Sequence, residues 1–431
     1  MRAMKDSGIK WIGEIPEEWE VCRLKNIFNL KTGTTPKEYD SKSQSDEYID
    51  WYTPSDIDDT RYILSDAQRK LAKEIIDKES INIYPNGSIL FVGIGATAGK
   101  VGYIVSTGYS NQQITALIPK TCFSKFYFYL LYVSKEIIRD NAFFTTLPII
   151  NNGYLSQVLT VCPFLSEQHR IATYLDNKCG EIDELIGIQE KFIEELKAYK
   201  QSVITEAVTK GLNSNATLKD SGVEWIGEIP EEWEVCRLKA KCVILRGGSP
   251  RPIEDYISET GYNWIKIGDT TKGYKYIDKT SLKINESGLV KTRLVHKNDL
   301  ILTNSMSFGN PYILNIDGCI HDGWVAFTEI RGLDKNYLYY LLLSSVCKNQ
   351  FSLQVDGGVV QNLNVDKIGR TNVCVPPLSE QQSIATYLDN KCSQIDSLIT
   401  LKQTKIDELK SFKKSLIYEY VTGKKTVPEN V

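Results

Sequence analysis

Two long segments of the chain carry apolar residues with a seven-residue period. One heptad position holds Leu175, Ile182, Leu196 and Val203 in the first segment, and Leu388, Ile395, Leu409 and Leu416 in the second. The next position holds Leu185, Phe192 and Tyr199, and then Leu398 and Phe412. A period sustained over about four heptads is typical of a coiled coil. The pattern predicts helices over about residues 166–210 and 379–422, which pair in opposite directions because one chain folds back on itself.

The ends and the seam of these predicted helices also follow known signals. The letters LSEQ place Ser166 at an N-cap, and Gly211 follows the first helix. Gln189 and Lys402 interrupt the apolar seam at matching places, as a residue that fixes register would. At ~1.5 Å per residue, a helix of about 45 residues is roughly 65 Å long, enough to hold two globular domains apart.

The segments that precede the helices show short apolar runs of the kind that form strands. Residues 26–162 contain such runs at 48–53, 88–94, 101–105 and 114–118, followed by a predicted helix at about 125–140. Residues 240–375 repeat this order with different letters, especially in the loops. Residues 5–25 mix tryptophan and isoleucine with Gly13 and Pro16, which favours a strand and turn that close the start of a domain.

Two blocks of sequence occur twice, which indicates a duplicated domain. Residues 5–25 and 219–239 differ only at Ile9/Val223 and Lys10/Glu224, and residues 163–179 closely match residues 376–392. The intervening segments have nearly equal length but unrelated loops. A period of this size is a whole domain rather than a solenoid repeat. Binding residues concentrate on loops held by a rigid frame, so this pattern predicts two binding domains of different specificity on one frame.

Composition and charge describe an ordinary globular chain. Of 431 residues, 42% are hydrophobic and 24% charged, the net charge is −3, and no apolar run reaches the ~20 residues of a membrane span. We expect a cytoplasmic protein. The ten cysteines form no CxxC pair and the three histidines are scattered, so we expect buried reduced thiols and no metal site. A basic surface is predicted within 266–297, where eight basic residues face three acidic ones.

Catalytic motifs are not found in the sequence. The stretch GIGATAGKV at 93–101 lacks the P-loop spacing and the Ser or Thr after the lysine, so it predicts a strand, a glycine turn and a strand, with Lys100 available to a phosphate. A nuclease-like Glu-Leu-Lys occurs only inside the heptad helices, at 195–197 and 408–410. Asn310-Pro311-Tyr312 lacks the second proline of an amino-methyltransferase motif. We therefore expect a non-catalytic chain.

The duplicated SGxxWIGEIPEEWE opening, the LSEQxxIAxYLD block before each heptad helix and the two divergent middles resemble the specificity subunit of type I restriction-modification systems. The resemblance covers essentially the whole chain. It implies an α+β protein with two duplicated α/β target recognition domains, joined by two long antiparallel coiled-coil helices with internal pseudo-two-fold symmetry. It implies target recognition domains at 1–163 and 212–376, and spacer helices at 164–211 and 377–431.

The resemblance also implies partners and cofactors. Each recognition domain would read one half of a bipartite asymmetric target in double-stranded DNA. The helices would set the spacer and dock two modification (methyltransferase) subunits, and a restriction (motor-nuclease) subunit would join for cleavage. S-adenosylmethionine, ATP and Mg would sit on those partner subunits and none in this chain. The alternatives are a coiled-coil adaptor without DNA readout, which leaves the divergent middles unexplained, and a fused catalytic restriction enzyme, which the missing motifs oppose.

Candidate DNA-binding residues are polar side chains in the predicted loops of the variable segments, because Asn and Gln can pair with adenine and Arg with guanine. In the first segment they are Lys31, Thr32, Thr34, Thr35, Lys37, Lys100, Asn111, Gln112, Gln113, Asn151, Asn152, Tyr154 and Gln157. In the second they are Arg246, Ser249, Arg251, Lys266, Lys272, Asn304, Ser305, Ser307, Gln354, Gln361, Asn362 and Asn364.

Overall fold

The computed structural model describes residues 2–37, 47–58, 62–79, 81–144, 148–271, 273–305, 308–354 and 363–428. The chain divides into two compact units. Unit 1 contains residues 1–188 and 405–431, and unit 2 contains residues 189–404. Unit 1 is thus assembled from two distant stretches of sequence, whereas unit 2 is continuous. Among the described residues, no helix combines the length and apolar character that crossing a membrane requires.

Unit 1 is built on a five-stranded sheet with the order β4-β11-β8-β9-β6. Its strands are β4 (Phe28–Thr32), β11 (Ile114–Pro119), β8 (Ile89–Val92), β9 (Val101–Ile104) and β6 (Ile63–Leu64). All pairings are antiparallel except that of β6 with β9. A second sheet contains β10 (Gly108–Ser110), β5 (Tyr48–Tyr52) and β7 (Lys70–Ala72). The strands predicted from apolar runs at 48–53, 88–94, 101–105 and 114–118 are therefore confirmed.

Unit 2 repeats the main sheet in the same order and directions. Its strands are β18 (Val243–Arg246), β27 (Trp324–Thr328), β24 (Leu300–Thr303), β25 (Pro311–Leu314) and β21 (Tyr276–Ile277). Its second sheet is larger, with β19 (Ile257–Ser258), β22 (Leu282–Ile284), β20 (Tyr262–Ile265), β26 (Gly318–Ile320) and β23 (Arg293–Val295). The parallel pair β5–β10 of unit 1 recurs as β20–β26. The duplication inferred from the sequence is therefore a duplication of fold.

Shorter strands frame each unit. In unit 1 they are β1 (Met4–Asp6) with β2 (Glu14–Pro16), β3 (Glu20–Arg23) with β14 (Leu159–Cys162), and β12 (Phe143–Phe144) with β13 (Pro148–Ile149). In unit 2 they are β15 (Leu218–Asp220) with β16 (Glu228–Pro230), and β17 (Glu234–Arg237) with β28 (Asn372–Val375). The prediction of a strand and turn in each repeated opening is confirmed.

The helices of the two units correspond, with two differences. Unit 1 has α1 (Leu24–Ile27), α2 (Lys73–Lys78), α3 (Ser124–Asp140) and α4 (Asn152–Gln157). Unit 2 has α6 (Glu286–Leu289), α7 (Lys335–Leu343), α8 (Ser345–Gln354) and α9 (Val365–Arg370). The counterpart of α1 in unit 2 is a 3-10 helix (Leu238–Ala240). The single aromatic helix predicted for unit 2 is in fact two, because Ser344 is extended. Its Oγ bonds the carbonyl of Leu341 at 2.6 Å, and it accepts a bond from the amide of Cys347 at 3.4 Å.

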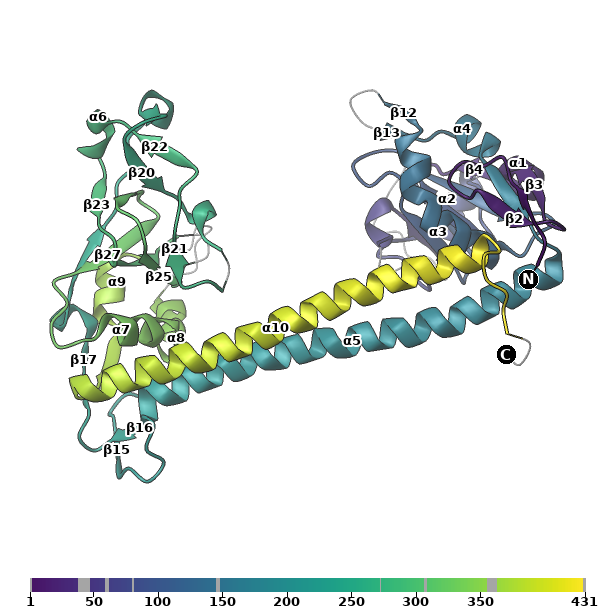
Figure 1. The fold of residues 1–431 in the computed structure, drawn as a ribbon. Helices are drawn as coiled ribbons and strands as arrows, with labels where there is room; N and C mark the ends of the chain where they lie inside the picture. Colours follow the sequence, from purple (N-terminus) through teal and green to yellow (C-terminus); the bar gives the residue numbers. More distant parts are fainter. Residues whose placement is uncertain are drawn as a thin grey trace. The chain divides into compact units, whose positions relative to one another are not determined.

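The two long helices are α5 (Leu165–Lys210), with 46 residues, and α10 (Leu378–Val421), with 44. They match the predicted ranges within one residue and pack together (Figure 1). In unit 1 the start of α5 packs with the end of α10, and Lys413 bonds Asp183 at 2.6 Å. In unit 2 the end of α5 packs with the start of α10, and Lys200 bonds Asp396 at 2.6 Å. These contacts make the pair antiparallel, as predicted.

The predicted second seam position of these helices is wrong. Leu185, Phe192 and Tyr199 are 47%, 45% and 49% exposed, and Leu398 and Phe412 are also exposed. The helices meet instead through the position one residue later, where Ile186 and Ile193 in α5 and Cys392 and Ile406 in α10 are buried. The predicted second position and the residue after it lie on either side of the first seam position, which was predicted correctly. Both carry apolar residues, so the seven-residue period alone could not show which of them faces the partner helix.

The repeated opening anchors each unit to a long helix in the same way. The buried Trp19 donates its indole N–H to Glu167 at 2.8 Å, and the buried Trp233 donates to Glu380 at 3.0 Å. Each carboxylate lies at the start of a long helix. The prediction that this aromatic motif seals the start of the domain is confirmed.

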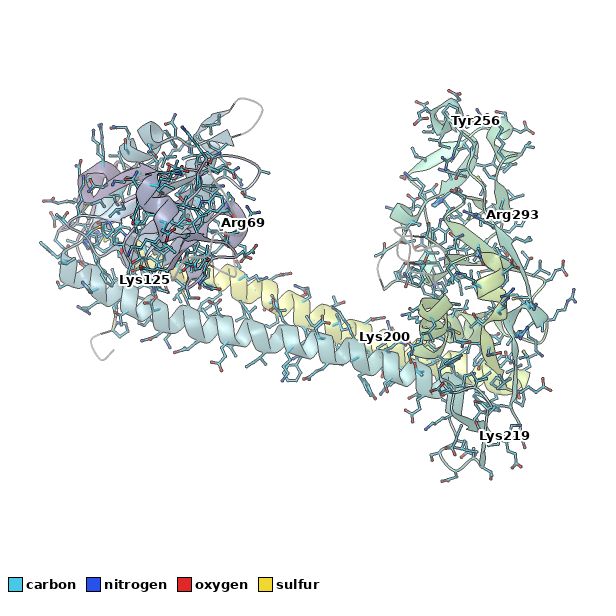
Figure 2. All side chains as sticks on the ribbon, turned by 180° about the vertical axis from the view of Figure 1, so that it is seen from behind. Arg69, Lys125, Lys200, Lys219, Tyr256 and Arg293 are labelled. Carbon is cyan, nitrogen blue, oxygen red and sulfur yellow. A yellow bond between two sulfur atoms is a disulfide. The ribbon has the colours of Figure 1, made fainter. Side chains whose placement is uncertain are left out.

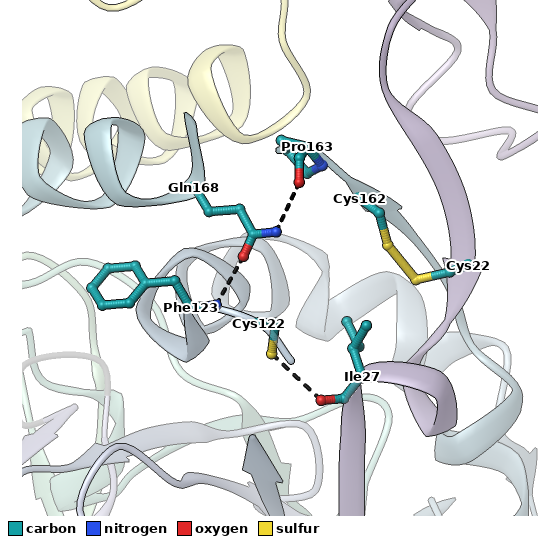
Figure 3. Close-up of a disulfide and its surroundings, with 7 residues drawn as sticks. All are labelled: Cys22, Ile27, Cys122, Phe123, Cys162, Pro163 and Gln168. Atoms are coloured by element: carbon teal, nitrogen blue, oxygen red, sulfur yellow. Dashed lines mark hydrogen bonds between the residues drawn. A yellow bond between two sulfur atoms is a disulfide. The ribbon is translucent and has the colours of Figure 1, made fainter. Parts of the chain in front are cut away.

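A glutamine beside each of those glutamates ties the helix to the variable segment. Gln168 donates to the carbonyl of Pro163 at 2.8 Å and accepts from the amide of Phe123 at 2.9 Å (Figure 3). Gln381 repeats both bonds with Pro376 and Asp334. The bonds to Phe123 and Asp334 use only backbone amides of the variable segments. They therefore do not depend on which side chains those segments carry.

Acidic residues of the repeated helices bind each unit through side chains. Tyr129 in unit 1 and Tyr340 in unit 2 donate their hydroxyls to Asp176 and Asp389, both at 2.6 Å. A lysine also reaches each aspartate: Lys125 at 3.3 Å in unit 1, and Lys275 at 2.6 Å in unit 2. Figure 2 labels Lys125 on unit 1 and Lys200 on α5 of unit 2.

One pair of cysteines departs from the prediction of reduced thiols. Cys22 and Cys162 form a disulfide between β3 and β14 (Figure 3). The strand register explains the pairing, because Cys22 faces Thr160 and Cys162 lies two residues farther along the same strand. In unit 2 the residue diagonal to Cys236 is Val375, and both Cys236 and Cys374 are free.

Candidate nucleic-acid interface

The predicted polar loops of unit 1 leave the main sheet at one edge. Strand β4 ends at Thr32 and β8 ends at Val92, whereas the antiparallel β11 between them begins at Ile114. The register places Thr115 opposite Thr32, and Ile114 opposite Val92. The loops 33–37, 93–100 and 111–113 therefore gather at this edge, which we call the loop edge. Residue 150 joins them, because its amide donates to the carbonyl of Gly93 at 2.8 Å.

Backbone contacts hold these loops together. A side chain at Gly33 would overlap the carbonyl oxygens of Ser110 and Asn111, so only glycine fits this approach. Beyond it the hydroxyl of Thr35 donates to the amide oxygen of Gln112. Asn111 and Gln113 bond each other twice, at 3.0 and 3.1 Å. Thr35 and Gln112 are exposed, so the loop edge presents a fixed group of amides and a hydroxyl to solvent.

Unit 2 builds the same loop edge with different side chains. A Cβ at Gly247 would overlap the carbonyl of His321, as at Gly33. Ser249 donates to the carboxylate of Asp322 at 2.7 Å, which repeats the Thr35–Gln112 contact with a charged acceptor. Arg246 donates through Nε to the carbonyl of Asp322 at 3.1 Å, and Arg251 lies 3.6 Å from its carboxylate. Two exposed arginines are thus held beside one aspartate.

The charge state of this turn follows from its surroundings. The hydrogen bond from Ser249 lowers the pKa of Asp322, so this carboxylate is charged at neutral pH. Burial lowers the pKa of His321, whose Nδ1 accepts the amide of Gly323 at 2.8 Å. The imidazole is therefore neutral at neutral pH. Carboxylate oxygens can accept from cytosine, and arginine can donate two bonds to guanine.

Several predicted residues form hydrogen bonds with other parts of the fold. Asn151 and Asn364 cap α4 and α9 through bonds of 2.8 and 2.9 Å to backbone amides. The remaining members of this group bond other protein groups: Lys31 to Asn82, the amide of Lys37 to Glu79, Lys100 to the carbonyl of Ile57, Asn152 to Thr115, Tyr154 to the carbonyl of Ile138, Gln157 to Arg23, and the amide of Lys266 to Asp269.

The other predicted residues differ in accessibility. Thr32 and Thr34 are exposed, and Ser305 is partly buried. Asn304 is only 1% exposed, so its side chain does not reach solvent as expected of a reading residue. It follows β24 directly, and its carbonyl accepts the amide of Leu363 at 2.9 Å. Lys272, Ser307, Gln361 and Asn362, and the side chain of Gln354, lie outside the described residues.

His321 and Asp322 are members of the loop edge that were not predicted. They occupy the turn before β27, where Asn111 and Gln112 stand before β11 in unit 1. Aligning those two turns would have found them, because the flanking strands were already matched. In the described part of the chain, no group of three or more His, Cys, Asp or Glu residues is placed to hold a metal ion.

Comparison with known proteins identifies relatives over the whole chain. A family model described as "Type I restriction modification DNA specificity domain" matches residues 16–198 and 230–411. The specificity subunit of the type I restriction enzyme MjaVIII of Methanocaldococcus jannaschii is 26% identical over 425 residues, 95% of this chain and 93% of that protein. The putative MjaX specificity subunit of the same organism is 28% identical over 427 residues, 96% of this chain and 95% of that protein.

A solved structure has the same fold. It is described as "Structural basis underlying complex assembly and conformational transition of the type I R-M system", and it superposes with a TM-score of 0.72 at 17% identity. The match covers 94% of this chain and 98% of that one. With a specificity domain matched in each of its two repeats, the chain belongs to the specificity subunits of type I restriction-modification systems.

Proposed function

We propose that each loop edge reads one half of a bipartite DNA target. The observation that carries this proposal is that the two units share the glycine contact at Gly33 and Gly247 and the hydroxyl contact at Thr35 and Ser249, while the acceptors differ. An amide at Gln112 and a carboxylate at Asp322 offer different hydrogen-bond patterns to base edges. The two units thus share one backbone arrangement but present different polar groups. This combination fits two domains that read unrelated half-sites better than it fits an adaptor without DNA readout.

The long helices set the spacer between the half-sites in this proposal. At 46 residues, α5 is roughly 69 Å long. The chain itself is non-catalytic. Methyl transfer and cleavage belong to modification and restriction subunits, which hold S-adenosylmethionine, ATP and Mg, and the assembly acts in the cytoplasm on double-stranded DNA.

We test the proposal with the methylome of a host that carries the modification subunits with or without this chain. A bipartite methylated motif should appear only when the chain is present. Arg246→Ala should remove about 1–3 kcal/mol of the preference for the correct base at one position of one half-site. The other half-site should stay unchanged. The matched control is Arg331→Ala, because Arg331 is also exposed but follows β27 at the opposite edge of the same sheet. Equal effects of the two substitutions would contradict readout by the loop edge.

An apolar surface on the helix pair of unit 2 is proposed as a docking site for a modification subunit. Leu398 and Leu401 on α10 are 47% and 63% exposed, and Phe192 and Tyr199 on α5 are also exposed. The cation of Lys402 lies 4.9 Å from the Phe192 ring, and that of Lys391 5.8 Å from the Tyr199 ring. Apolar groups with charged neighbours are typical of protein interfaces.

Placing glutamates on this surface should weaken assembly. We expect Leu398→Glu with Leu401→Glu to reduce affinity for the modification subunit at least tenfold, because two buried apolar contacts would become charged. The residual methylation should keep the same motif. Ser393→Glu with Thr400→Glu adds the same charges on another side of α10 and should bind normally. Analytical ultracentrifugation of the mixed subunits measures the affinity, and equal loss in both variants would contradict the docking site.

A further inference from the structure

A cavity of about 190 Å³ lies beside the glycine turn of unit 1. Its lining comes from residues 96–100 of the turn between β8 and β9, and from Lys135, Glu136 and Arg139 of α3. The volume is several times that of a water molecule. Its lining residues include the cations Lys100 and Arg139 and the anion Glu136, whereas the ammonium of Lys135 lies 4.6 Å from the ring of Tyr132.

The turn contributes backbone donors. Gly95 and Gly99 have φ angles of +103° and +96°, which let the chain reverse tightly. Within the turn the amide of Ala98 bonds Gly95, and that of Lys100 bonds Thr97. In the described part of the chain, the amides of Ala96 and Thr97 have no protein acceptor. Successive amides in such a turn are a common way to bind an anion.

The side chains add charged donors. The ammonium of Lys100 gives one hydrogen bond, to the carbonyl of Ile57 at 2.8 Å, although an ammonium has three donors. Arg139 uses Nε toward Asp140 at 3.3 Å, and among the described residues its two Nη groups have no partner. Glu136 is approached by Lys414 at 3.6 Å, which offsets its charge.

Unit 2 shows that the fold does not require these charges. In unit 1 a Cβ at Gly99 of the turn would lie 3.5 Å from the Cβ of Arg139. A Cβ at Gly309 of unit 2 would meet the ring of Phe351 at 3.0 Å. The ring of Phe351, which is buried, therefore lies in unit 2 where unit 1 has Arg139.

The cavity belongs to the loop edge. The amide of Gly93, at the start of the turn, donates to the carbonyl of Gln113 at 2.8 Å. A Cβ at Gly95 would lie 3.6 Å from the side-chain nitrogen of Gln113. An anion held in the cavity would thus sit next to the amides that are proposed to read bases.

We infer that this cavity binds a phosphate group of the DNA backbone and so fixes the register of unit 1 on its half-site. Lys100, Arg139 and the amides of Ala96 and Thr97 supply the donors. Phosphate contacts position a protein on the duplex without carrying sequence information, so this role is separate from base readout. The inference rests on the proposed function and adds the contact that orients the first reader.

The test measures DNA affinity of the complex with its modification subunits between 50 and 200 mM salt. The plot of log affinity against log salt has a negative slope, and each lost phosphate contact makes this slope shallower by about 0.9. Raising the salt fourfold weakens DNA binding by every form of the complex. For Lys100→Gln and for Arg139→Gln, this weakening should be about 3.5-fold smaller than for the unsubstituted complex. The effect should be equal on the methylated motif and on a scrambled duplex, and the methylated motif itself should not change.

Lys120→Gln is the matched control. Lys120 also gives its ammonium to a backbone carbonyl, that of Lys25 at 2.9 Å, but it follows β11 at the opposite edge of the sheet. Its substitution should leave the salt slope unchanged. If Lys100→Gln does not fold, Arg139→Gln alone decides. A slope equal to that of the control, or an effect confined to the specific duplex, overturns the inference.

A second measurement separates the backbone of DNA from a free phosphate compound. Duplex DNA should protect Arg139 from phenylglyoxal, as followed by mass spectrometry of the intact complex. Protection by inorganic phosphate or ATP but not by duplex would overturn the assignment to DNA. If the unsubstituted complex binds no duplex, the proposed function fails as well. If it binds duplex and neither variant changes the slope, only this inference fails.

Discussion

Exchanging residues 26–162 with residues 240–375 should give a subunit whose methylated motif holds the same two half-sites in the opposite order. The frames that receive the segments are nearly identical in sequence and share their main anchoring contacts. Trp19 and Trp233 donate to equivalent glutamates, and Gln168 and Gln381 bond backbone amides rather than variable side chains. Each segment would therefore meet the same anchoring groups at its new place.

The contacts from variable side chains to the helices also have equivalents. Tyr129 would leave Asp176 and meet Asp389, and Tyr62 would leave the Asp183–Lys413 pair and meet Asp396 and Lys200. Only contacts to non-equivalent helix residues are lost, such as that of Ser345 with Thr205 at 2.8 Å. A hydrogen bond of this kind contributes about 1 kcal/mol, so the exchanged protein should still fold.

The exchange also moves one partner of the disulfide. Cys162 would travel with its segment and lie diagonal to Cys236, while Cys22 would stay behind with Val375 at the diagonal position. The methylome of the exchanged protein is the measurement, with mass spectrometry of its disulfides as an internal check of register. Loss of both half-sites despite normal assembly, or a changed spacer, would show that specificity does not reside in autonomous segments.

Asp183→Ala should destabilise unit 1 by about 2 kcal/mol, less than the cost of breaking a fully buried ion pair, because the Asp183 side chain is itself 44% exposed. The side chain of Lys413 is only 6% exposed, and its ammonium bonds both carboxylate oxygens of Asp183 at 2.6 Å and the hydroxyl of Tyr62 at 2.5 Å. Removing the carboxylate leaves a buried cation without a counter-charge. In a unit of this size the melting temperature should fall by roughly 4–8 °C.

The symmetric pair in unit 2 is a built-in comparison. Lys200 is 21% exposed, so water can replace the lost partner and Asp396→Ala should cost only about 1 kcal/mol. Adding Lys413→Met to Asp183→Ala should recover stability, because the unpaired charge is removed. Thermal unfolding of the four proteins measures both effects. A double variant as unstable as Asp183→Ala would mean that lost packing, not buried charge, is responsible.

The sequence predicted the strands, the long helices and the positions of the polar loops because each rests on local periodicity or on the repeat. It placed the second seam position on Leu185 rather than on Ile186, because both neighbours of the seam are apolar. Lys200 and Lys413 also lie on the true seam. A lysine at a seam position suggests that the apolar seam is interrupted there, unless the distant aspartate that pairs with it is known.

The remaining errors concern residues whose surroundings come from distant sequence. Asn304 was expected to be exposed because it follows a strand, yet the packing of unit 2 buries it. Cys22 and Cys162 are 140 residues apart, and only the register of β3 and β14 brings them together. Loop letters alone also could not separate Gln112, which faces solvent, from Asn151, which caps a helix.

Because unit 1 combines residues 1–188 with residues 405–431, the ribosome makes its two parts at different times. At about 5–20 residues per second, synthesis of the intervening stretch takes roughly 10–40 s. During that time the apolar seam at the start of α5 has no partner helix, whereas the continuous unit 2 has both halves of its own pair. Unit 2 should therefore be complete first, and the seam residues of the nascent unit 1 stay without their partner helix until the end of α10 emerges.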